Sequence, residues 1–128
     1  MRASQEAHAV GSTQVERLEK IGEFDPNAFA PGPDAAERAG RALLELAEPM
    51  RGALKQHMGI WRDLAVKKRK TEVDMQSGAL VEYGERAGIP TPVNAATLQV
   101  IHEIEAEERG MGWDNLDAIA SLAGVSAG

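Results

Sequence analysis

The sequence predicts an all-α protein, a bundle of about five helices joined by short turns. Apolar residues recur at spacings of three and four along most of the 128 residues, as one face of a helix requires. No stretch shows the sustained alternation and β-branched enrichment of a strand. Glycines and prolines cluster where the helical patterns stop, which marks turns. We therefore expect one helical domain that spans residues 1–128.

The composition narrows the class of protein. The chain contains no cysteine, which excludes disulfides, thiolate chemistry and cysteine-ligated zinc. Its net charge of −6 argues against nucleic-acid binding as the main activity. No apolar run approaches the ~20 residues that span a bilayer, and the first residues lack the apolar segment of a signal peptide. We expect a cytoplasmic protein whose partners include neither a membrane nor a nucleic acid.

The first half of the chain should contain a short helix, a loop and a long helix. Residues 2–10 fit a helix that ends at Gly11. Residues 22–33 hold three of the six prolines and are predicted as a loop, in which Phe24 and Phe29 anchor against the core.

The long helix is predicted to start at Asp34, because Glu37 three residues later completes an N-terminal capping signal. A broad apolar face follows this start. Pro49 should interrupt the helix, since proline removes an intrahelical hydrogen bond and crowds the preceding turn. The helical pattern then resumes toward Gln56.

The clearest helix start in the second half is Thr71. Its hydroxyl oxygen suits an N-cap, and Asp74 can reach back to the Thr71 N–H as a shorter form of the capping-box glutamate. Glu72 would then occupy the first helical position, where unpaired N–H groups and the helix dipole favour a carboxylate. Gly88 fits the end of this helix, because Pro90 prevents its continuation.

Two more helices are predicted toward the C-terminus. Asn94 should cap a helix that ends at Gly110, and a last short helix should run from Asp114 to Leu122. The buried stripe of the first is predicted to be Leu98, Val100, Ile101 and Ile104. The buried residues of the second are predicted to be Leu116, Ile119 and Leu122, with Trp113 pinning the helix.

A basic run precedes the Thr71 helix and consists of Lys67, Lys68, Arg69 and Lys70. It is a candidate for phosphate binding, on a nucleotide or a nucleic acid. The run lacks interleaved aromatic residues, however, and it is followed by a helix N-terminus that itself prefers anions. The alternative interpretation is a solvated basic surface.

No metal site is predicted. The histidines lie far apart and show no i, i+4 pairing with one another or with a carboxylate at a metal-binding spacing. These histidines are His8, His57 and His102. Four acids crowd one predicted helix end without the spacing of a calcium-binding loop, and a solvated acidic end is expected there. These acids are Glu103, Glu105, Glu107 and Glu108.

Glu72 is the one candidate catalytic residue among the motifs. The chain has no G-x-G-x-x-G dinucleotide loop, no P-loop and no Ser/His/Asp elbow. No cofactor-binding residue is therefore predicted. A helix-start acid with no catalytic role is an equally good interpretation of Glu72 from the pattern alone.

A composite motif lies between residues 57 and 108, in which T-E-[IV]-D is followed by G-[IV]-x-[TV]-P-x-N. The residues that carry it are Asp63-Leu64, Arg69-Lys70-Thr71-Glu72-Val73-Asp74, Gly78, Gly84, Gly88 and Pro90-Thr91-Pro92-Val93-Asn94. This motif resembles the C-terminal helical domain of the ketopantoate reductase (2-dehydropantoate 2-reductase) family.

The resemblance implies an NADPH-dependent reductase that passes a hydride to the ketone of a 2-keto acid such as ketopantoate. It implies a helical fold of the 6-phosphogluconate dehydrogenase C-terminal-like type, which closes the substrate cleft against a Rossmann domain that holds NADP. Glu72 falls on the family's active-site glutamate, where it helps organise the substrate and cofactor end of the cleft.

The chain departs from the family pattern at three points. No lysine lies in the context of the family's catalytic lysine, Gly59 stands where many members have a substrate-binding serine, and the Rossmann half is missing. Hydride transfer needs a held cofactor and an acid for the developing alkoxide. We expect a domain that is inactive alone, with a Rossmann domain or a second copy as partner. The alternative is a non-enzymatic helical module for dimerisation or protein interaction.

Overall fold

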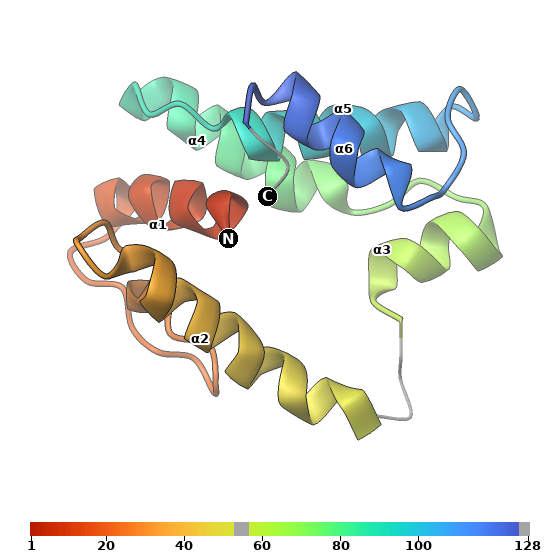
Figure 1. Ribbon diagram of the computed structural model, residues 1–128. Coiled ribbons are helices and arrows are strands. Elements are labelled where there is room, and N and C mark those ends of the chain that lie inside the picture. Colours follow the sequence, from red (N-terminus) through yellow and green to blue (C-terminus); the bar gives the residue numbers. More distant parts are fainter. Residues whose placement is uncertain (53–56, 126–128) are drawn as a thin grey trace. The chain divides into compact units, whose positions relative to one another are not determined.

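A computed structural model describes residues 1–52 and 57–125 of the chain (Figure 1). Within these ranges the regular structure is helical, apart from one isolated antiparallel bridge between Ile21 and Phe24. The all-α prediction is therefore confirmed. The contacts divide the chain into two compact units, Met1–Gln56 and His57–Gly128, which are described separately. None of the described helices is long and apolar enough to cross a membrane.

In its described residues, 1–52, the first unit consists of two α-helices and two short 3-10 helices. These are α1 (Arg2–Gln14), η1 (Pro26–Phe29), α2 (Ala35–Ala47) and η2 (Glu48–Gly52). The predicted interruption at Pro49 is confirmed, because α2 gives way there to the tighter η2. The predicted continuation toward Gln56 lies outside the described residues.

The core of the first unit lies where η1 contacts α2. Phe29 is 2% exposed and forms a buried cluster with Ala28 and Ala39. The Phe24 ring stacks on Phe29 with the ring centroids 5.9 Å apart, but it stays 40% exposed. Arg38 of α2 fixes the loop by donating to the carbonyls of residues 28 and 30. Phe29 is thus the predicted core anchor, and Phe24 only covers it.

Two local predictions in this unit were wrong. The first helix continues through Gly11 to Gln14, because Gly11 does not adopt the left-handed conformation of a helix-ending glycine. The Leu18 side chain packs beside it instead, 3.2 Å from where a Cβ of Gly11 would lie. Asp34 does precede α2, but its carboxylate makes no capping bond and instead pairs with Arg38 Nη1 at 2.5 Å. A tertiary contact and an ion pair replace the expected stop and cap.

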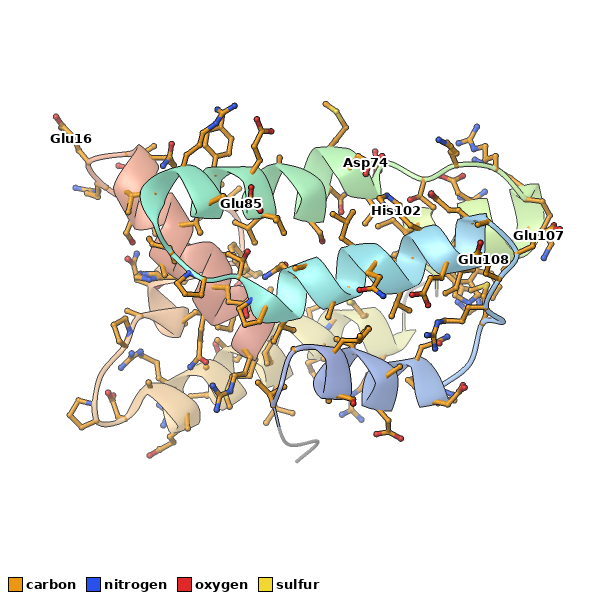
Figure 2. The ribbon with its side chains drawn as sticks, turned by 90° about the horizontal axis from the view of Figure 1, so that it is seen from above. Glu16, Asp74, Glu85, His102, Glu107 and Glu108 are labelled. Atoms are coloured by element: carbon orange, nitrogen blue, oxygen red, sulfur yellow. The ribbon has the colours of Figure 1, made fainter. Side chains whose placement is uncertain are left out.

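Between residues 57 and 125, the described part of the second unit, there are four α-helices and two π-helical segments. They are α3 (Gly59–Arg62), η3 (Asp63–Lys67), η4 (Asp74–Gly78), α4 (Ala79–Ala87), α5 (Pro92–Glu105) and α6 (Asp114–Leu122). The segment η3 continues α3, and η4 leads directly into α4. Helix α5 lies between the η4–α4 helix and α6 and contacts both (Figure 2).

The ends of the helices in this unit follow glycine and proline. Gly88 caps α4 in the left-handed conformation, with φ of 68°, as predicted. Helix α5 starts at Pro92 rather than after Asn94, because proline is suited to the first helical position, where an N–H has no partner. Thr91 is therefore the N-cap, and the helix ends at Glu105, before the predicted Gly110.

The predicted buried stripes were only partly right. In α5 the buried residues are Asn94, Ala96 and Val100, while the other predicted members of the stripe are half-buried. In α6 the buried residue is Asn115, whose side-chain amide donates to the Gly110 carbonyl at 2.9 Å. That bond sets the inward face of α6. The predicted core residues that remain exposed are Trp113 at 88%, Leu116 at 59% and Leu122 at 50%.

We predict that Gly88→Ala destabilises the second unit by about 1 kcal/mol, because a Cβ strains the left-handed conformation. Circular dichroism during urea unfolding measures the change. Gly110→Ala is the matched control, since Gly110 has no positive φ and nothing within 4 Å of a new Cβ. Equal stabilities of the two variants would contradict the prediction.

Candidate functional site

Glu72 lies in a short non-helical connection between η3 and η4. Polar contacts of Asp63, Thr71 and Asp74 define this connection. The first involves Asp63, which starts η3 and is 9% exposed. Its Oδ1 atom accepts from Arg69 Nε at 2.9 Å and lies 3.2 Å from Lys67 Nζ. The Arg69 N–H also donates to the Asp63 carbonyl at 3.1 Å. Asp63 thus closes a turn at the end of η3.

This turn explains the basic run. Lys68, with φ of 49°, occupies the left-handed cap position of η3. Lys67 and Arg69 converge on Asp63, so two of the four basic residues are committed to an internal ion-pair cluster. Sequence reasoning singled out the cations and missed the carboxylate that organises them. The signal was available, because Asp63 is the first residue of the family motif.

The Arg69 hydrogen bond holds the pKa of Asp63 below its usual value of 3.8, against the opposing effect of burial, and Lys67 adds to the lowering. The unfolded chain therefore takes up this proton at a higher pH than the folded chain. The stability that Asp63 contributes is complete above the unfolded pKa and is lost as the pH falls through the folded one.

We predict that Asp63→Asn lowers stability at pH 7 and makes the stability less dependent on pH below about 4. Urea unfolding at a series of pH values tests this. Glu85→Gln is the control, because Glu85 is exposed and forms no ion pair in the described part of the chain. An acid dependence as steep in the Asp63 variant as in the wild type would refute the assignment.

The predicted helix start at Thr71 is confirmed for one hydrogen bond and wrong in its position. Glu72 is not the first helical residue, because η4 begins at Asp74 with Val73 before it. The Thr71 hydroxyl oxygen accepts from the Val73 N–H at 3.2 Å, as the N-cap prediction requires. Asp74 does not reach back to Thr71. Its Oδ1 atom lies 2.8 Å from His102 Nε2 of α5, and the two side chains point toward each other (Figure 2). The Thr71 N–H instead donates to Glu105 Oε1, also of α5, at 2.6 Å.

The Glu72 side chain is open to solvent and has Gln76 as a hydrogen-bond partner. Glu72 is exposed, and its Oε1 atom accepts from Gln76 Nε2 at 3.0 Å. A Cβ at Gly59 would lie 3.8 Å from the same oxygen. The fold therefore brings Glu72 next to Gly59. Two residues before Gly59, the His57 ring stacks on Trp61 with 3.7 Å between centroids.

Two of the four acidic side chains around the end of α5 form hydrogen bonds within the described part of the protein. Glu103 Oε2 accepts from Arg109 Nε at 2.5 Å, and Gln99 donates to the other carboxylate oxygen. The bonds from Gln99 and Arg109 lower the pKa of Glu103. The prediction of a solvated acidic end was wrong for Glu103 and Glu105, because both have internal partners. It holds for Glu107 and Glu108, which are exposed (Figure 2).

A cavity of about 490 Å³ lies beside the Glu72 connection, at the end of α5. Leu64, Ile104 and Met111 supply apolar lining, and Lys68 and Lys70 supply cationic groups. Glu105 also lines this cavity, whereas Glu72 and Gly59 do not. Among the described residues no three potential metal ligands come together.

The amino-acid sequence matches a known protein family. The family model described as Ketopantoate reductase PanE/ApbA C terminal matches residues 3–105. The chain belongs to the ketopantoate reductase family. No curated protein and no solved structure gives a significant match to the chain. The matched range includes residues of both compact units and corresponds to the C-terminal domain of a ketopantoate reductase.

Two departures from the ketopantoate reductase pattern, the missing lysine and the glycine at position 59, concern described residues. In the described part of the first unit, Lys20 is the one lysine, and it lies outside α1 and α2 with its ammonium 3.9 Å from Glu23. No described helix of that unit therefore carries a lysine. Gly59 supplies no hydroxyl next to Glu72. Glu72, the site residue that the family resemblance suggested, is present and exposed in the described part of the chain.

Proposed function

We propose that this chain is the substrate-side domain of an NADPH-dependent reductase of 2-keto acids, in which Glu72 is a catalytic residue that contacts the substrate or cofactor. The observation that carries the proposal is the family match combined with the placement of Glu72. Its carboxylate is exposed, lies beside Gly59 and is held by Gln76. Those are the properties of a group that can meet a ligand from outside the domain.

The reaction would transfer a hydride from NADPH to the carbonyl carbon of the keto acid and a proton to its oxygen, which yields a 2-hydroxy acid and NADP⁺. Hydride transfer needs the cofactor within reach of the carbonyl. This chain has no glycine-rich phosphate loop, so a Rossmann partner would hold NADP. The domain alone should be inactive, and its cysteine-free sequence suits a reducing cytoplasm.

Reconstitution tests the proposal. NADPH oxidation is followed with a panel of 2-keto acids, first with the chain alone and then with a Rossmann half added. That half is the product of any Rossmann-coding region directly upstream or the cofactor domain of another ketopantoate reductase. We expect activity only in the mixture. Absence of binding between the two halves, measured by calorimetry, would count against the proposal.

A second candidate function is a non-enzymatic interaction module. The observation that favours it is the exposed apolar surface at the start of α6, where Trp113 directly precedes the helix and Leu116 lies in its first turn. A second copy of the chain could cover such a surface. Sedimentation at several concentrations separates the candidates, because a strictly monomeric chain would remove the dimerisation hypothesis.

A further inference from the structure

We propose that Glu105 is a positioning residue that fixes the backbone of the Thr71–Glu72 connection and thereby the direction of the Glu72 carboxylate. The proposal rests on the proposed function of Glu72. Glu105 belongs to α5 and lies 34 residues further along the chain than Thr71. Its action on the site passes through a backbone N–H and not through a substrate.

The contact has the geometry of a strong hydrogen bond. The Thr71 N–H donates to Glu105 Oε1 at 2.6 Å, and the bond is partly buried. Charge-assisted bonds of this kind are short and about twice as strong as neutral ones. In a capping box, the N–H of the N-cap residue is satisfied by a side chain of the same helix. Here a residue of a different helix makes that bond, because Asp74 is directed elsewhere.

Asp74 supplies a second link to the same helix. Its carboxylate contacts His102, which precedes Glu105 by three residues and so lies about one turn away on α5. This pair is exposed and should contribute less than the Glu105 bond. Glu72 thus lies between two residues, Thr71 and Asp74, that are each tied to one turn of α5.

The position of Glu105 in its own helix supports a specific role. It is the last residue of α5, where the helix dipole disfavours a carboxylate. Its neighbour Glu103 is compensated by Arg109, but no cation contacts Glu105 among the described residues. The partner of Glu105 is instead the Thr71 N–H, which lies shortly before η4.

The test compares Glu105→Ala with Glu105→Gln in the reconstituted enzyme. The alanine variant removes the acceptor, and we expect kcat to fall roughly tenfold with KM changed by less than about twofold, because the site forms but Glu72 is misplaced. The glutamine variant keeps an oxygen that can accept from Thr71, so most of kcat should return. Glu108→Ala is the control, since its exposed carboxylate makes no hydrogen bond in the described part of the chain.

A second readout needs no catalysis. In NMR spectra of the chain alone, the Thr71 amide resonance should shift as Glu105 titrates, and this shift should disappear in Glu105→Gln. That comparison remains valid if Glu105→Ala does not fold. A Thr71 resonance that ignores the ionisation of Glu105 would overturn the proposal, and so would a glutamine variant as impaired in kcat as the alanine variant.

The two proposals can fail separately. If Glu72→Ala retains full activity in the mixture, the proposed function of Glu72 is wrong whatever Glu105 does. If Glu72→Ala is inactive while Glu105→Ala keeps the wild-type kcat, the function stands and the positioning role is wrong.

Discussion

Replacing Glu72 by glutamine is expected to lower kcat of the reconstituted reductase by on the order of 100-fold while the chain keeps its fold. The charge is lost, but the shape and the Gln76 contact can persist, because a side-chain amide oxygen also accepts a hydrogen bond. Steady-state kinetics with NADPH and the best keto acid of the panel measure the effect. Circular dichroism and urea unfolding establish that the variant is folded.

Glu85→Gln is the matched control for this substitution. Glu85 is also an exposed glutamate of the second unit, in α4, and it makes no ion pair in the described part of the chain (Figure 2). Its replacement should leave kcat and KM unchanged. If both variants lose activity equally, a general loss of negative charge explains the result. If neither loses activity, Glu72 is a helix-start acid without a catalytic role.

Phe29→Ala is expected to destabilise the first unit by about 3–5 kcal/mol. Phe29 is almost completely buried in the cluster with Ala28 and Ala39, and alanine would leave a cavity that these small neighbours cannot fill. The two tryptophans and the tyrosine all lie in the second unit, so fluorescence does not report on this change. Hydrogen exchange over residues 1–52, followed by mass spectrometry, does.

Amide exchange in α2 should accelerate by roughly 100-fold or more in this variant. Phe24→Ala is the control, because Phe24 stacks on Phe29 but is 40% exposed, and its loss should cost about 1 kcal/mol. A Phe29 variant that exchanges no faster than the Phe24 variant would show that the predicted core anchor is not one.

The predictions that succeeded depend on neighbours in the sequence. The Thr71 hydroxyl accepts from the N–H two residues on, Gly88 ends α4 through its own φ, and Pro49 ends α2 through its missing N–H. Each effect acts within about one helical turn, which is the range that a sequence pattern describes. The candidate residue Glu72 came from the same local signal together with the family motif.

Several predictions failed because a hydrophobicity pattern ranks neither the geometry of a helix start nor a single polar bond. The α5 start moved from Asn94 to Pro92, and Asn94 became a buried residue. Trp113 and Leu116 stayed exposed because the Asn115 side chain binds the Gly110 carbonyl and sets the face of α6. A hydrophobicity pattern ranks a leucine above an asparagine for burial, and one well-placed polar bond reverses that order.

The sequence by itself determined that this protein is helical, that α4 ends at Gly88, and that Glu72 lies just before a helix start within a ketopantoate reductase motif. Only the tertiary structure decided which groups hold that start. Sequence spacing offered Asp74 as the partner of the Thr71 N–H, yet Glu105 of α5 takes that place at 2.6 Å and Asp74 turns to His102. The physical reason is that a backbone donor takes the acceptor that packing brings nearest, and packing joins residues that the sequence keeps far apart.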